Sequence, residues 1–413
     1  MKNGRRVVIT GVGALTPLGI GVKESWEGLC AGKSGIGRIT RFDASNLPTQ
    51  IAGEVKGFDA REYMDRKVLR RSDLFAQYAI ASTRMALKDA NLEVTDEVSL
   101  RTGVILGSAV GGIGTLCHNM KTPAEGNIEG VSKMLASMYI PSAGANDISV
   151  VFGLKGPSRG LSTACATGGH CIGDAVRLIQ YDDADIMVAG ASEAQIVPIF
   201  VESIARLNAS STRNSEPERA SRPFEKDRDG LVNGEGAGVL VLEELQHALN
   251  RGAHIYAEIV GFASNIDAYH AVKPECESQA RCITLALKDA QIAPDEVEYV
   301  NAHGTATVLG DLSETQALKK AFGAHAQRMM VSSNKSMLGH MWAASGAVEA
   351  IFTALTLETG IIPPTINYET PDPECDLDYV PNVKREVPVR TAMSQSFGFG
   401  GMNAVLVFRR WEG

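Results

Sequence analysis

The chain has 413 residues, of which 40 are lysine or arginine and 48 are aspartate or glutamate, so its formal net charge is −8. Hydrophobic residues make up 44% of it, enough for a large buried core, which excludes an intrinsically disordered protein and a small disulfide-stabilised one. The negative charge balance, without a long lysine or arginine run, gives no reason to expect a nucleic-acid partner.

The amino-terminal stretch has the outline of a secretory signal, because basic residues precede an apolar run from Val7 to Val22. Glycines and Pro17 interrupt that run, and no small-residue cleavage site follows it, so we predict a strand and a turn instead. No run of about 18 apolar residues occurs, so no membrane span is expected. The seven cysteines are an odd number without a C-x-x-C pair, which disfavours a disulfide framework and a zinc knuckle. We therefore expect a cytoplasmic protein with reduced thiols.

Short runs rich in valine and isoleucine alternate with amphipathic segments along the first half of the chain. In chain order these segments are 7–10, 75–87, 104–106, 172–179 and 186–189. Alternating strands and helices are typical of a layered α/β fold with buried strands. Polar residues then fill 208–236, which we expect to be a long surface loop that enters a strand at 237–242.

The sequence contains an internal repeat. The pentapeptide Ala-Leu-Lys-Asp-Ala at 86–90 recurs at 286–290, and Asp-Glu-Val at 96–98 recurs at 295–297. In each copy a helix ends, an acidic turn follows, and a strand runs into a glycine-rich loop. This order predicts two duplicated halves, 1–250 and 251–413.

A second repeated unit places two turns at corresponding positions. In the first half a strand turns at 164–169 into a helix at 171–180, and in the second half a strand turns at 334–340 into a helix at 343–357. These turns carry Cys165 and His340. If the halves pack about a pseudo-dyad, the two turns can face each other across one shared site.

Cys165 and two histidines are the candidate chemical groups. Cys165 precedes a segment with apolar residues at i, i+3, i+4 and i+7, which predicts a helix. A helix amino terminus favours a thiolate, so Cys165 could be a nucleophile. The alternative is that Cys165 is a small residue of the core. His303 lies beside Gly304, which lets a ligand approach the backbone. One imidazole beside the thiol would suit a hydrolase, whereas His303 and His340 together could donate N–H to one oxygen and stabilise an enolate.

Near the carboxyl terminus, the glycine-rich segment 396–403 runs into a strand at 404–408. Its glycines free backbone amides for close approach, so the amides of Phe399 and Cys165 could together bind a thioester oxyanion. The ring of Phe399 could also act as an apolar lid, and a tight turn before an edge strand is the alternative. For Lys335, the default expectation is a solvated surface position.

These motifs resemble the elongating, type II β-ketoacyl-[acyl carrier protein] synthases. The similarity extends over essentially the whole chain, in blocks at 7–11, 163–168, 221–230, 234–238, 301–305, 335–340 and 397–403. It implies a thiolase-like α/β fold with five layers, αβαβα. The catalytic residues that it implies are Cys165, His303, His340, Lys335 and Glu349. The oxyanion-hole or gating residues would be Cys165 and Phe399, and the substrate-binding residues Thr305, Thr307, Phe397 and Gly400.

The resemblance also implies a reaction. An acyl group moves from the phosphopantetheine thiol of an acyl carrier protein to Cys165, and malonyl-carrier protein enters. His303 and His340 assist decarboxylation, and the resulting carbanion attacks the acyl thioester to give a 3-oxoacyl product. No bound cofactor and no metal ion are expected, because phosphopantetheine carries the substrates. The family is usually homodimeric, and Lys67, Arg70 and Arg71 are a candidate basic cluster for the acidic carrier protein.

Departures from the elongating enzymes leave the substrate open. The segment 271–278 is shorter than usual, Trp342 stands where smaller residues are common, and 195–211 differs from the ordinary fatty-acid pattern. Fatty-acid elongation therefore competes with a specialised polyketide or polyene ketosynthase that forms a heterodimer with a chain-length-factor-like subunit. A thiolase-like, coenzyme A-dependent acyltransferase is a further alternative, but it typically needs a second cysteine, and the glycine-rich segment offers Phe399 instead.

Overall fold

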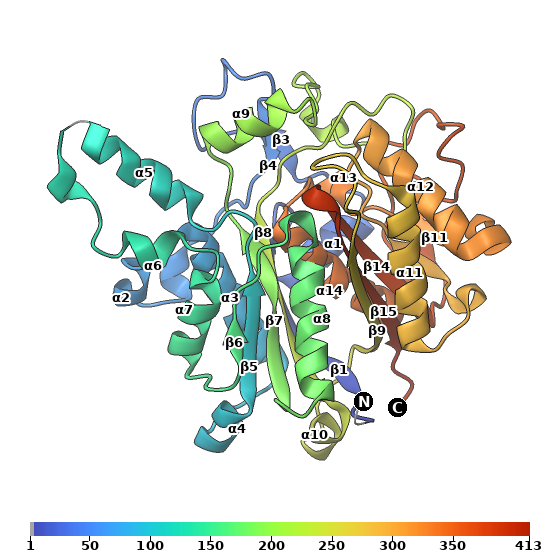
Figure 1. Cartoon of the computed structure of the whole chain (residues 1–413), viewed down its shortest axis with the longest axis horizontal. Helices are drawn as coiled ribbons and strands as arrows, with labels where there is room; N and C mark the ends of the chain where they lie inside the picture. Colours follow the sequence, from blue (N-terminus) through green and yellow to red (C-terminus); the bar gives the residue numbers. More distant parts are fainter. Residues whose placement is uncertain (1–3, 125) are drawn as a thin grey trace.

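The computed structural model describes residues 4–124 and 126–413, and most of its strands belong to one large sheet (Figure 1). The strands of this sheet are β1 (Val7–Thr16), β2 (Gly19–Ile20), β5 (Thr102–Gly107), β6 (Ser158–Arg159), β7 (Ile186–Glu193), β8 (Gly236–Glu244), β9 (Ala257–Ile266), β10 (Tyr299–Asn301), β11 (Met330–Ser332), β14 (Thr391–Gly398) and β15 (Met402–Arg410). Their order is β11-β10-β14-β15-β9-β1-β8-β7-β5-β6, with β2 paired to β1. Two small ribbons pair β3 (Ile36–Arg38) with β4 (Ile51–Gly53) and β12 (Ile361–Ile362) with β13 (Arg385–Glu386).

Helices lie on both faces of this sheet. They are α1 (Val22–Cys30), α2 (Arg66–Leu69), α3 (Leu74–Asp89), α4 (Asp96–Leu100), α5 (Ile113–Ala124), α6 (Leu135–Tyr139), α7 (Ala143–Phe152), α8 (Thr167–Gln180), α9 (Pro198–Arg206), α10 (Leu245–Asn250), α11 (Cys276–Ala290), α12 (Val308–Phe322), α13 (Lys335–Leu338) and α14 (Ala343–Thr359).

The elements stack in five layers, which confirms the predicted fold class. The sheet divides where β1 meets β9, and α8 and α14 pack between its two halves. Helices α3 and α7 cover the outer face of the first half, and α11 and α12 cover that of the second. Residues 343–357 of α14 are buried on every side, as expected for a helix in a middle layer.

The two halves repeat each other strand by strand. The orders β1-β8-β7-β5-β6 and β9-β15-β14-β10-β11 carry the same succession of antiparallel and parallel pairings. The repeated pentapeptide ends α3 and α11, each of which packs closely on a strand glycine. A Cβ added to Gly11 would lie 2.3 Å from the carbonyl oxygen of Ala86, and one added to Gly261 would lie 2.7 Å from that of Ala286. The sequence repeat therefore preserves the same close helix–strand contact in both halves.

Several predicted elements are longer in the structure. The strand predicted at 7–10 continues to Thr16, so the signal-like run forms β1, a turn and β2, and Val22 begins α1. The strand is longer than predicted because β1 continues to pair with β8 and to pack against α3 beyond residue 10. The edge-strand alternative for 404–408 is wrong, because β15 lies between β14 and β9. No helix among the described residues is both long and apolar enough to span a bilayer.

Candidate active site

Cys165 lies in a 3₁₀ turn, Ala164–Ala166, which leads directly into α8. Ala164 has a φ of 50°, in the left-handed region that non-glycine residues rarely adopt, so the turn is sharply bent. The side chain of Cys165 is buried, and the backbone N–H groups of Phe399 and of Cys165 itself lie close enough to the sulfur to lower the pKa of the thiol. The two amides predicted to bind an oxyanion therefore lie at the sulfur.

Small residues bring the turn before α8 close to the start of α14. A Cβ added to Gly168 would lie 2.5 Å from the amide nitrogen of Ala347 and 2.7 Å from the carbonyl oxygen of Ala343. The two helices consequently cross with their backbones in contact. This contact brings Cys165 beside His340, which occupies the turn between α13 and α14.

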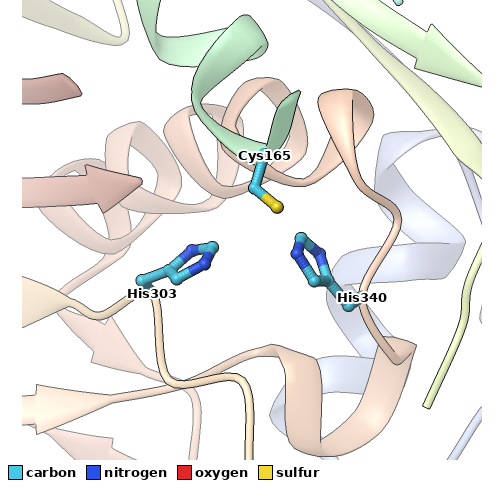
Figure 2. A group of neighbouring side chains, drawn as sticks. All are labelled: Cys165, His303 and His340. Atoms are coloured by element: carbon cyan, nitrogen blue, oxygen red, sulfur yellow. The ribbon is translucent and has the colours of Figure 1, made fainter. Parts of the chain in front are cut away.

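His303 and His340 converge on the sulfur of Cys165 (Figure 2). His303 follows β10, and its ring centroid lies 5.3 Å from that of His340, with the ring planes at 85°. One ring nitrogen of each histidine and the sulfur all lie within 4.8 Å of one another. A thiol and two imidazoles are also ligands that zinc accepts, so this is the place in the described chain where a soft metal ion would fit.

The hydrogen bonds of His340 fix the position of its proton. Its Nδ1 accepts the backbone N–H of Trp342 at 3.2 Å and lies 3.0 Å from the hydroxyl oxygen of Ser345. The neutral ring therefore carries its proton on Nε2. That nitrogen is buried and has no hydrogen-bond partner among the described residues, so its N–H is available to a substrate oxygen.

Both imidazoles are neutral at physiological pH. Burial lowers the pKa of His303 and of His340 well below the ordinary value of 6.5, and the charge of Lys335 lowers both further. Lys335 is itself buried, and its Nζ donates a hydrogen bond to Glu349. The surface position expected for Lys335 is therefore wrong, because its charge is compensated by a carboxylate on α14 rather than by water.

The thiolate expected at Cys165 is also wrong for the resting site. Burial raises the pKa of the Cys165 thiol to about 11, although the N–H of Phe399 and the charge of Lys335 act in the opposite direction. Desolvation of the charged form outweighs the stabilisation that a helix amino terminus gives. Acyl transfer to the sulfur consequently needs a group that accepts the thiol proton, and a neutral imidazole lies next to it.

Glu314 is a site residue that the sequence analysis missed. Its carboxylate oxygens accept the backbone N–H groups of His303 and Gly304, each at 2.7 Å, and burial raises the pKa of Glu314 to about 8. Asp311, one turn earlier on α12, accepts the N–H of Ala306 in the same loop. The sequence did contain a signal for this role: two acidic residues lie one turn apart near the start of the helix that follows the loop of His303.

A cavity of about 320 Å³ leads to Cys165 and is lined by both histidines, Thr305, Thr307, Phe397 and Phe399. The hydroxyl oxygens of Thr305 and Thr307 lie 2.9 Å apart. Gly400 is outside this lining, and its N–H donates to the carbonyl oxygen of Ala271 at 2.8 Å. Lys335 and Glu349 are also outside the lining. Lys335 acts on both histidines through its charge, and Glu349 accepts a hydrogen bond from Lys335.

The candidate basic cluster of Lys67, Arg70 and Arg71 does not lie at the cavity. It belongs to α2 and the residues that follow, which lie away from α8, α13 and α14 in Figure 1, and Val68 of α2 shares a hydrophobic cluster with Ile148 of α7. Lys273 is the basic residue that lines the cavity itself. A role of the α2 cluster in docking stays a prediction.

Comparisons with known proteins agree with this arrangement. The family descriptions "Beta-ketoacyl synthase, N-terminal domain" and "Beta-ketoacyl synthase, C-terminal domain" match residues 4–248 and 256–369. The chain is 47% identical to the 3-oxoacyl-[acyl-carrier-protein] synthase 2 of Coxiella burnetii, covering 98% of this chain and 99% of the relative. It is 46% identical to the protein of the same name from Staphylococcus aureus, with both chains covered completely.

Solved structures with the same fold include ketosynthases. A β-ketoacyl synthase from Burkholderia phymatum superposes with a TM-score of 0.93 at 38% identity, covering 99% of this chain and 100% of that one. The ishigamide ketosynthase/chain length factor gives a TM-score of 0.92 at 36% identity, with coverage of 98% and 99%. A type II polyketide ketosynthase solved in complex with its acyl-carrier protein gives 0.91 at 37% identity, with coverage of 98% and 100%.

Proposed function

This chain belongs to the β-ketoacyl synthase family, and we propose that it condenses an acyl thioester with malonyl-[acyl carrier protein], giving 3-oxoacyl-[acyl carrier protein] and CO₂. The convergence of the Cys165 sulfur with His303 and His340 inside one cavity carries this conclusion. The enzyme is therefore a carbon–carbon bond-forming acyltransferase.

The first step loads the acyl group onto Cys165. The sulfur attacks the carbonyl carbon of the acyl-carrier thioester, and the thiol proton passes through a neutral imidazole to the departing carrier thiol. The backbone amides of Cys165 and Phe399 both act on the sulfur, so they can hold the oxygen of the tetrahedral intermediate. Cys165 then carries the acyl group as a thioester.

Decarboxylation of the malonyl group follows at the histidines. The bond to the carboxylate breaks, CO₂ leaves, and its electron pair forms an enolate whose oxygen accepts the N–H groups of His303 and His340. Lys335 is a positioning residue in this step, because its charge adds to burial in lowering the pKa of both rings, and it does not contact the substrate. Glu314 fixes the loop of His303 through two backbone N–H groups.

Condensation completes the cycle. The enolate carbon attacks the acyl carbonyl carbon, the bond to sulfur breaks, and the Cys165 thiolate takes a proton from solvent. The thiol, the two imidazoles and the backbone amides supply every step, so we propose that no bound cofactor takes part. Thr305 and Thr307, on the wall of the cavity, offer two hydroxyl groups to the phosphopantetheine arm of an acyl carrier protein.

Two pathways remain in competition. Relatives named 3-oxoacyl-[acyl-carrier-protein] synthase 2 reach 47% identity over almost the full chain. The type II polyketide ketosynthase and the ishigamide ketosynthase/chain length factor among the solved structures reach 37% and 36%. This difference supports fatty-acid elongation. A coenzyme A-dependent, thiolase-like enzyme usually needs a second cysteine at the active site. In this chain the glycine-rich segment brings Phe399 to the sulfur instead, which argues against that alternative.

We propose a homodimer. Helices α5 and α6 form an arm that projects from the body in Figure 1, and it exposes apolar side chains such as Ile128 (75% exposed) and Met134 (43%). β6 is also an exposed strand at one edge of the sheet. Replacing Ile128 and Met134 by glutamate should give monomers in light scattering, while Val383→Glu, at an exposed valine elsewhere, should not. A stable complex formed only with a co-expressed chain-length-factor-like relative would favour the heterodimer.

Intact-protein mass spectrometry tests the function directly. Incubation with an acyl-carrier protein should add the acyl mass to the chain, and malonyl-carrier protein should then release it as a 3-oxoacyl product. Cys165→Ala should prevent the adduct, whereas Cys276→Ala, which removes a half-buried thiol elsewhere in the chain, should leave it unchanged. Equal rates with coenzyme A thioesters would contradict the dependence on a carrier protein.

A further inference from the structure

During condensation, two groups must occupy the site at the same time: the acyl chain on Cys165 and the malonyl group at the end of the carrier's arm. The cavity that opens at Cys165 has a volume of about 320 Å³, at the small end of the range of roughly 300–1,000 Å³ for ligand pockets. In the proposed reaction, the carrier's arm must pass through that space to bring its malonyl group to the histidines that line it. The acyl chain must therefore extend to another side of the sulfur.

Cys165 also belongs to an apolar cluster that shares Leu231 and Phe399 with the cavity lining and extends beyond it. Its buried members besides Cys165 are Phe200, Ile204, Leu231 and Trp342, and Phe399 packs against them. Among the described residues, neither Phe200 nor Trp342 lines the cavity that leads to solvent. An acyl chain can enter this cluster only by using space between side chains that are already in contact.

Trp342 is held at several points within this cluster. Its indole N–H donates to the Oδ1 atom of Asn233 at 3.0 Å, and its ring lies parallel to His340, with 5.3 Å between ring centroids. The centroids of Phe200 and Phe399 lie 4.9 Å and 5.7 Å from that of the indole, both in edge-on contact. The indole therefore cannot turn aside without breaking the bond to Asn233 and disturbing His340.

We propose that Trp342 determines the length of the acyl donor. Its indole ends the space that is open to a chain on Cys165, so the enzyme accepts short acyl groups and discriminates against long saturated ones. This inference rests on the proposed function, because it presupposes an acyl group on the sulfur. It also follows that a chain long enough to push the indole would shift His340, so the penalty falls on catalysis as well as on binding.

Trp342→Leu tests the proposal, because leucine keeps an apolar side chain but removes most of the ring. Wild type and variant are offered a mixture of saturated acyl-carrier proteins of increasing length, and the adduct on Cys165 is identified by intact mass. We expect the variant to accept longer chains, with a gain of about fourfold in kcat/KM for each methylene group newly accommodated. Trp342→Phe, a smaller ring without the N–H, should shift the limit by less.

Trp26→Leu is the matched control. Trp26 also stacks on an aromatic ring, that of Phe352 at 5.9 Å, but it lies outside the cluster around Cys165. It should keep the chain-length profile of the wild type, and thermal unfolding of each variant checks that it folds. An unchanged profile in folded Trp342→Leu would overturn the proposal, as would a wild type that already accepts long chains. A wild type that acquires no acyl group from any carrier would instead contradict the proposed function.

Discussion

Alanine in place of His303 or His340 should slow the decarboxylation of malonyl-carrier protein by a factor of about 10²–10³. The structure limits His340 to one useful donor, because its Nδ1 already accepts the N–H of Trp342 and only Nε2–H is free. Removal of one such donor from an oxyanion raises the barrier by about 2.7–4 kcal/mol, which corresponds to that factor. Because both rings serve the same oxygen, the two losses should not add fully in the double variant.

The assay separates decarboxylation from acyl transfer. Cys165→Ala removes the sulfur but leaves both imidazoles, so this variant should release CO₂ from labelled malonyl-carrier protein without condensation. Each histidine variant is made in that background. His254→Ala is the control, since His254 is a surface residue that pairs with Glu358. A loss of less than tenfold in both variants would refute the enolate role and return His303 and His340 to structural roles.

Three further predictions concern charge, metal binding and the repeat. Acyl transfer needs an imidazole to take the thiol proton, so its rate should not decline between about pH 8 and pH 6, where both rings are neutral. Lys335→Met should raise the pKa of both rings toward 6.5, which NMR titration can measure. In this variant the loss of acyl-transfer rate on acidification should therefore begin at a higher pH. Zn²⁺ should inhibit the enzyme and protect Cys165 from alkylation, and EDTA should reverse both effects; alkylation at an unchanged rate would exclude binding there. Gly11→Ala and Gly261→Ala should each lower the free energy of unfolding by about 1–3 kcal/mol in urea titrations, and Gly11→Ala should lower it more because its contact is closer.

The sequence predicts the fold and the three central side chains because those features have local signals. The pentapeptide repeat marks the two halves, and the turns that carry Cys165 and His340 precede helices in corresponding positions. The burial of Lys335 has no such signal, since it depends on Glu349, fourteen residues later on another helix. The protonation of Cys165 was predicted wrongly for a related reason: a helix amino terminus is visible in a sequence, whereas the desolvation that outweighs it depends on the whole pocket.

The duplicated fold also gives the proton-transfer groups and the apolar cluster at Cys165 two different supporting loops. The loops that follow β5 and β10 occupy corresponding positions, and a buried glutamate holds each of them by backbone N–H groups. In the second half, Glu314 holds the loop that presents His303 to the cavity. In the first half, Glu193 accepts the N–H of Ala109 at 2.7 Å, and that loop packs against the apolar cluster that contains Trp342. The loop after β10 thus supplies an imidazole for the enolate, while the loop after β5 adds to the wall against which the acyl chain must fit. Substitutions in the loop after β5 can therefore change which acyl chains are accepted without altering the proton-transfer groups.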